Sequence, residues 1–202
     1  MQGNTQSVML FNRWSTSDVK VSDMGLKNYI NLNPIVIPRS GGRYGTGMHK
    51  NRMNIVERLI NKMMIPGHRG KKHKITSGHN VGNSVTLYNN LKSAFELIET
   101  RAKKNPVQVL IQALENSSPL EEVAAYRLGG IIARKAVVVA PQRRIDLALR
   151  HLSQGIYKAK FKSRTPLPEL IANEIIAAAN NDTKSFPIME RNRLEKEEEG
   201  SR

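Results

Sequence analysis

The chain of 202 residues contains no cysteine. This absence excludes disulfide bridges, zinc sites built on thiolates and cysteine nucleophiles, and it fits a reducing compartment. The longest apolar runs, at 136–140 and 175–179, fall far short of the ~20 residues that span a bilayer. The N-terminal stretch lacks the basic lead and the apolar segment of a secretion signal. We therefore expect a soluble cytoplasmic protein with no membrane contact.

Aromatic and acidic residues are also scarce. One Trp, four Phe and five Tyr offer few rings for stacking on single-stranded bases. Only 17 Asp and Glu stand against 32 Lys and Arg, which gives a net charge of +15. Such an excess indicates a polyanionic partner. Recognition of folded RNA through its shape and phosphates fits this composition better than base stacking.

Two segments carry the positive charge. Residues 39–74 hold ten bases and one acid, and residues 127–164 hold ten bases and one acid. A run of charge can serve solubility alone, but clustered cations are what release counterions from phosphates. We therefore interpret the two blocks as one RNA-binding surface that folding brings together.

The chain divides into an arm and a helical domain. Residues 1–50 show little helical periodicity and are broken by Pro and Gly, which predicts an extended arm of the kind that lies on a partner. Residues 51–202 carry successive helical patterns. One of these starts at Asn105 with a capping side chain, Pro106 in the first turn and Gln108 as the reciprocal partner of the cap. We expect a mainly α protein: a bundle of about six helices with a β-hairpin between the third and fourth.

The predicted hairpin and the helix after it are unusually basic. Residues 123–139 alternate around Gly129-Gly130 but carry bases before and after this tip, as an arm reaching out of the body would. From Gln142 to Lys158, Ile145 and its helical neighbours form an apolar face. Arg143, Arg150, Gln154, Tyr157 and Lys158 lie opposite that face, with Arg144 and His151 adjoining them. This spacing predicts a helix that packs on one face and is cationic on the other.

Motifs for small-ligand chemistry are weak. GRYGTG at 42–47 resembles a phosphate loop, but Met48-His49 follows where Lys and then Ser or Thr are needed. His68, His73 and His79 have no Cys or acid cluster beside them, so we expect neither a metal nor a cofactor. No nucleophile elbow, HExxH motif or apolar carboxylate pair is present, so we expect no enzyme.

Several motifs occur in a characteristic order. They are NIVERLINKMM, GKK, LKSAFELIE, NPVQVLIQALEN, RLGGIIARKAVVVAPQRR, DLALRHL and ELIANEIIAAAN. In this order they resemble the seventh universal protein family of the small ribosomal subunit, from about residue 51 to 202. LFNRWSTSDVKVSDMGLKNYI and PRSGGRYG resemble the N-terminal extension of its archaeal and eukaryotic branch, and the undivided tip favours the archaeal form. The loop at 73–90 is longer than in most members, and the C-terminus is more acidic.

The resemblance implies a structural protein that binds the 3′ major domain of the small-subunit ribosomal RNA and nucleates folding of the head. It also implies a hairpin at the exit site, near messenger and transfer RNA, with other small-subunit proteins as neighbours and no homo-oligomer. The residues that we predict to bind ribosomal RNA are Arg39, Arg43, Lys50, Arg52, Lys62, Arg69, Lys71, Lys72, Lys74, Arg143, Arg144, Arg150, Lys158, Lys160, Lys162 and Arg164. Those that we predict at the exit site are Arg127, Leu128, Gly129, Gly130, Ile131, Ile132, Arg134 and Lys135.

Two alternatives stay open at this point. The hairpin edge could add a strand to another protein, with or without RNA contact. The first two helices could form the helix-turn-helix of a DNA-binding regulator, although the loop between them is much longer than the usual turn of about three or four residues.

Overall fold

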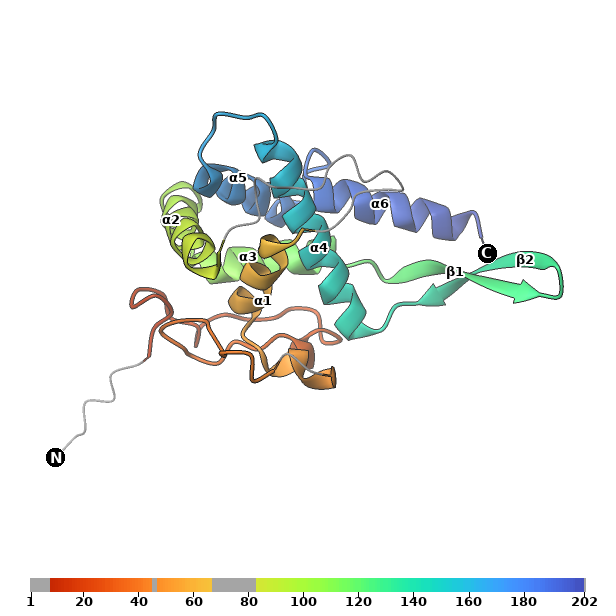
Figure 1. Ribbon diagram of the computed structural model, residues 1–202, viewed down its shortest axis with the longest axis horizontal. Helices are drawn as coiled ribbons and strands as arrows, with labels where there is room; N and C mark the ends of the chain where they lie inside the picture. The colour runs from red at the N-terminus through yellow and green to blue at the C-terminus, as the bar shows by residue number, and fades with distance from the viewer. Residues whose placement is uncertain (1–7, 45–46, 67–82, 202) are drawn as a thin grey trace.

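The predicted architecture is confirmed. A computed structural model describes residues 8–44, 47–66 and 83–201. Within these ranges lie two short 3-10 helices, six α-helices and a two-stranded antiparallel sheet between α3 and α4 (Figure 1). The 3-10 helices are η1 (Lys27–Tyr29) and η2 (Gly47–Arg52). The other elements are α1 (Ile55–Met64), α2 (Ser84–Ala102), α3 (Pro106–Ser117), β1 (Glu121–Leu128), β2 (Ile131–Val138), α4 (Pro141–Lys160), α5 (Leu167–Ala179) and α6 (Phe186–Glu199).

Asparagine side chains cap the first three α-helices. The side chains of Asn54, Asn83 and Asn105 each accept a hydrogen bond from a backbone N–H in the first turn of the helix that follows. The predicted reciprocal role of Gln108 is wrong. Its side chain instead pairs with the backbone of Lys20 in the arm, accepting from N at 2.8 Å and donating to O at 3.0 Å. These two hydrogen bonds attach the arm to α3.

The arm is extended, but its described part lies on the protein's own helices. Leu10, Phe11 and Trp14 are buried in the same core as the helices. Phe11 and Trp14 both meet Phe95 of α2 edge-on, with ring centroids 5.9 and 5.6 Å apart. Leu26 joins this core at 0% exposure. The described part of the arm therefore packs on the protein's own helices, because burying these rings removes a large apolar area from water. Its contact with a partner stays a prediction.

Helix α4 runs through the middle of the body and packs against α1, α3, α5 and α6. Its apolar face is the predicted one, with Ile145 and Ile156 fully buried. The predicted opposite face is only partly cationic and exposed. Arg144, His151, Gln154 and Tyr157 are buried as well. The periodicity gave the direction of each side chain correctly but could not show that neighbours cover α4 on more than one side.

The hairpin protrudes from the body, with its tip far from the helices (Figure 1). Its two strands pair in register from Glu121 with Val138 to Leu128 with Ile131. Gly129 at the turn has φ +61°, a left-handed conformation that costs glycine nothing. Helix α6 packs against β1. The acidic C-terminal helix therefore braces the base of the hairpin. In the described part of the chain, no helix combines the length and apolar character needed to cross a membrane.

Candidate nucleic-acid interface

The two basic blocks meet where α1 packs on α4. Arg58 of α1 is 5% exposed, and its guanidinium lies 3.1 Å from a carboxylate oxygen of Asp146 on α4. Lys50 of η2 approaches the other oxygen of Asp146 at 3.9 Å. Arg58 also donates to the carbonyl of Tyr29 at 3.0 Å. Asp146, the one acid of the second block, is therefore a point of contact between that block and the first.

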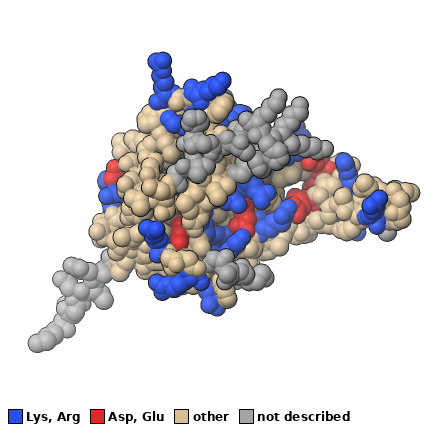
Figure 2. All heavy atoms as spheres, in the orientation of Figure 1, with Lys and Arg blue, Asp and Glu red and all other residues tan. Residues whose placement is uncertain are grey.

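Lys62 and Arg150 lie on the rim of this junction. Burial and the charge of Arg150 lower the pKa of Lys62, Asp146 opposes them, and Lys50 and Arg58 lower it further. Several cations therefore act on one another around a single carboxylate. Such a site gains from an added anion, because a phosphate would relieve the repulsion between them. Figure 2 shows Lys and Arg side chains gathered over this part of the face, around a few acids.

The predicted RNA-binding residues fall into several groups rather than one cradle. Residues 69–74, which contain four of them, lie outside the described residues. On the face of α1 and α4 and on the arm, the exposed or half-exposed members are Arg39, Arg43, Lys50, Arg52, Lys62 and Arg150. A further group lies at the C-terminal end of α4 and in the loop before α5. Of the second basic block (residues 127–164), only the part of α4 around Asp146 and Arg150 lies beside the first block (residues 39–74). The rest of the second block is spread over the hairpin and the far end of α4.

The prediction that Arg144 lies on the exposed cationic face of α4 is wrong. It is 8% exposed, and its guanidinium donates to Asp23 at 2.7 Å and to the carbonyl of Pro119 at 3.2 Å. Burial raises the pKa of Asp23, but the hydrogen bond and charge of Arg144 and the backbone N–H groups of Gly25 and Leu26 together outweigh burial, so this pKa is lowered. Arg144 therefore ties the arm and the entry of the hairpin to α4, and it has little surface for a phosphate.

Arg143 is exposed but already paired. Its Nε and Nη2 both donate to the carboxylate of Glu122 on β1 at 2.7 Å. The first cause of its raised pKa is this hydrogen bond, which outweighs burial. A bidentate pair of this kind fixes the angle between α4 and the base of the hairpin. Binding a phosphate through Arg143 would have to compete with that role.

The loop between α4 and α5 forms a second basic edge. Lys158, Lys162 and Arg164 are exposed there. Lys160 is half-buried, and its ammonium donates to the carbonyl of Thr165 at 2.7 Å, so it shapes the loop itself. The sequence reasoning missed Phe161, which is 42% exposed among these cations. The sequence feature that could have revealed Phe161 is an aromatic residue inside a run of Lys and Arg.

The hairpin carries free cations and exposed apolar side chains together. Arg127, Arg134 and Lys135 are exposed, and no described acid lies within ion-pair distance of them. Ile131 and Ile132 are 75% and 68% exposed. The predicted tip is therefore a surface able to contact both phosphate and an apolar partner. The side chain of Leu128 lies outside what the structure describes.

The other sequence motifs gain no support from the described residues. Part of GRYGTG, at 45–46, and the three histidines at 68–79 lie outside them. Among the residues that the structure describes, no group of three His, Cys, Asp or Glu could hold a metal. Helices α1 and α2 are separated by residues 65–83, far more than the roughly 3–4 residues of a helix-turn-helix. The DNA-binding alternative is therefore not supported.

Comparison with known proteins settles the family. Residues 26–202 match the family described as Ribosomal protein S7p/S5e. The chain belongs to this family. The small ribosomal subunit protein uS7 of Nanoarchaeum equitans is 44% identical over 194 residues, which cover 96% of this chain and 98% of that protein. Those of Archaeoglobus fulgidus and Cenarchaeum symbiosum are each 40% identical, over 95% and 98% of this chain and 93% and 98% of theirs.

Membership of the S7p/S5e family makes this chain a ribosomal protein of the small subunit, of the archaeal type. Its relatives are structural components and not enzymes. Membership of this family implies association with ribosomal RNA and with other ribosomal proteins.

Proposed function

We propose that this protein binds the 3′ major domain of the small-subunit ribosomal RNA in the cytoplasm and nucleates assembly of the head. The arm and the helical domain present the cations around the α1–α4 junction to phosphates. The observation that carries the proposal is the meeting of the two basic blocks around Asp146, at 3.1 Å from Arg58 and 3.9 Å from Lys50. A surface meant only for solubility would not need to concentrate cations from distant segments around one acid.

We further propose that the hairpin reaches the exit site, close to messenger RNA and the departing transfer RNA. Support comes from its projection out of the body (Figure 1) and from the exposed cations on both sides of its tip. Neighbouring small-subunit proteins would contact the exposed Ile131 and Ile132. Neutral side chains at Arg127 and Arg134 should leave head-domain RNA affinity nearly unchanged, because these residues lie outside the α1–α4 surface.

The test is the affinity for a head-domain RNA fragment as a function of salt. The double variant Lys62→Gln with Arg150→Gln removes two cations of the α1–α4 surface. Its matched control, Lys103→Gln with Lys104→Gln, removes the same charge from the exposed end of α2. We expect the first variant to lower the slope of log affinity against log salt by about 2, since each lost phosphate contact removes about 1. Equal losses in both variants would show that only net charge matters and would overturn the proposed surface.

A further inference from the structure

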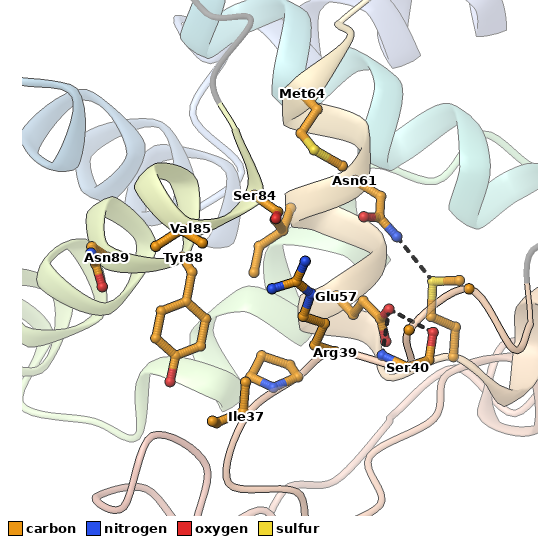
Figure 3. A pocket seen from close by; sticks show the side chains of 15 residues that line it. Ile37, Arg39, Ser40, Glu57, Asn61, Met64, Ser84, Val85, Tyr88 and Asn89 are labelled. Carbon is orange, nitrogen blue, oxygen red and sulfur yellow. Dashed lines mark hydrogen bonds between the residues drawn. The ribbon is translucent and has the colours of Figure 1, made fainter.

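A pocket of about 550 Å³ lies between the arm, α1 and the start of α2 (Figure 3). This volume is within the range of about 300–1,000 Å³ that is typical of sites for small molecules. Its lining is largely apolar and includes one aromatic ring. The apolar and aromatic lining residues that matter here are Ile37, Met53, Ile60, Met64, Val85 and Tyr88.

The pocket is held open by a hydrogen-bonded turn of the arm. The backbone N–H and the hydroxyl of Ser40 both donate to Oε1 of buried Glu57, at 2.8 and 2.7 Å. Gly41 and Gly42 follow with φ of +63° and +85°, so the chain turns sharply at this point. The turn is thus fixed to α1 before any ligand arrives. A preformed site loses little entropy when it is filled.

One cation lines the pocket and a second follows it closely in the sequence. Arg39 lines the pocket and is exposed, and no described acid lies within ion-pair distance of it. In Figure 3 its guanidinium extends into the space between Tyr88 and Glu57. Arg43 does not line the pocket but follows Gly42, which does; it is exposed, and its Nε donates to the carbonyl of Ser40 at 3.3 Å. The rim therefore favours a ligand with negative charge.

The wall opposite the arm offers a ring and amide groups. Tyr88 is half-buried, and its ring packs on Phe11 with centroids 4.8 Å apart. Burial raises the pKa of the Tyr88 hydroxyl, so this side chain stays neutral. Asn61 and Asn89 line the same pocket. Amides can both donate to and accept from the edge of a nucleobase, and aromatic rings stack on its face.

We propose that this pocket receives one unstacked nucleotide of the RNA that the protein binds, an inference that rests on the proposed function. The base lies against Tyr88 and the apolar wall, while Arg39 and Arg43 bind the adjoining phosphate. An apolar protein side chain would match the walls but would leave both arginines without an anion. A nucleotide matches both halves of the site, because it joins a flat apolar face to a phosphate.

The test fills the pocket without changing its charge. Val85 is 54% exposed on the pocket wall, so Val85→Trp should fold and occupy the space. Ser93→Trp is the matched control, because Ser93 is an exposed residue of the same helix that does not line the pocket. We expect Val85→Trp to bind the head-domain RNA fragment about tenfold more weakly, the scale of one lost base stack, and Ser93→Trp to bind as the wild type does.

Base-specific chemical probing of the bound RNA gives a second readout. One nucleotide should be protected by the wild type and by Ser93→Trp, and should become reactive with Val85→Trp. Unchanged affinity together with an unchanged footprint would overturn the nucleotide site while leaving the proposed function intact. Normal RNA binding by Val85→Trp combined with loss of a protein neighbour from assembled subunits would identify a protein occupant and overturn it too. A wild type that binds no head-domain RNA would instead refute the proposed function.

Discussion

The helical body and the hairpin treat the same kinds of residue in opposite ways. In the body, Arg58 and Arg144 are buried and paired with Asp146 and Asp23. On the hairpin, exposed arginines face no described acid, and Ile131 is 75% exposed. Some of the body's arginines thus fix its own geometry while others, such as Arg150, stay exposed; the hairpin keeps both its cations and its apolar area exposed. A basic composition therefore does not by itself say which cations are available for RNA.

The largest expected effect separates two consecutive arginines. Arg144→Ala should lower the free energy of unfolding by about 3 kcal/mol, because it leaves the partly buried Asp23 carboxylate without its partner. Arg143→Ala should cost under about 1 kcal/mol, because the Arg143 side chain is 53% exposed. Thermal unfolding followed by circular dichroism measures both variants. We expect Arg144→Ala to lower the melting temperature by about 6–12 °C.

Asp23→Asn provides the control for that pair. It removes the charge of the same ion pair from the arm side and should destabilise the fold in the same direction. Equal melting temperatures for Arg143→Ala and Arg144→Ala would mean that burial of Arg144 contributes no stability. That result would return Arg144 to the exposed surface on which the sequence placed it.

The next effect depends on pH and belongs to the body alone. Burial lowers the pKa of His151 to about 4, with Glu190 opposing and Arg150 and Arg193 adding to the shift. In the unfolded chain His151 becomes protonated as the pH falls below about 6.5, whereas in the folded protein it stays neutral until about pH 4. The free energy of unfolding is therefore unaffected by His151 above pH 6.5 and decreases as the pH falls from 6.5 toward 4. At pH 5 the loss amounts to about 2 kcal/mol relative to pH 7.5.

His151→Gln isolates this contribution from the carboxylates that titrate nearby. Urea unfolding at pH 7.5 and pH 5 should give a smaller pH-dependent loss for the variant than for the wild type. The same loss in both proteins would show that His151 is not responsible. The hairpin has no histidine, so variants confined to the hairpin should keep the full pH dependence of the wild type.

Features set by neighbouring residues in the sequence were predictable. Asn105 and Pro106 mark the start of α3, and Gly129 marks the tip of the hairpin, because caps and turns depend on local backbone geometry. The interpretation of the two basic blocks as one cradle stays a prediction, because only part of the second block lies beside the first. Fold class and element order therefore followed from pattern and from the family resemblance together.

Features set by distant partners were not predictable. Arg144 pairs with Asp23, which lies 121 positions away in the sequence, so a helical projection of α4 could not show its burial. Gln108 has the spacing of a capping partner but bonds to Lys20, 88 positions away. Tyr88 fits an ordinary helical pattern, and only the placement of the arm makes it the wall of a pocket. In each case the same side chain could serve either role by its chemistry, and only the packing of distant segments determines which one it has.

The smallest expected effect compares one glycine from each region. In α4, a Cβ at Gly155 would lie 2.8 Å from Cβ of Phe186 and 2.9 Å from Oε1 of Glu174, which accepts hydrogen bonds from Ser185 and Phe186. Gly155→Ala should therefore displace the start of α6 and cost about 1–2 kcal/mol, even after the gain in helix propensity. At Gly130 of the hairpin a Cβ meets nothing within 4 Å, so Gly130→Ala should change stability by less than about 0.5 kcal/mol. Urea unfolding of both variants measures the difference, and a neutral Gly155→Ala would show that α4 and α6 can separate without loss of packing.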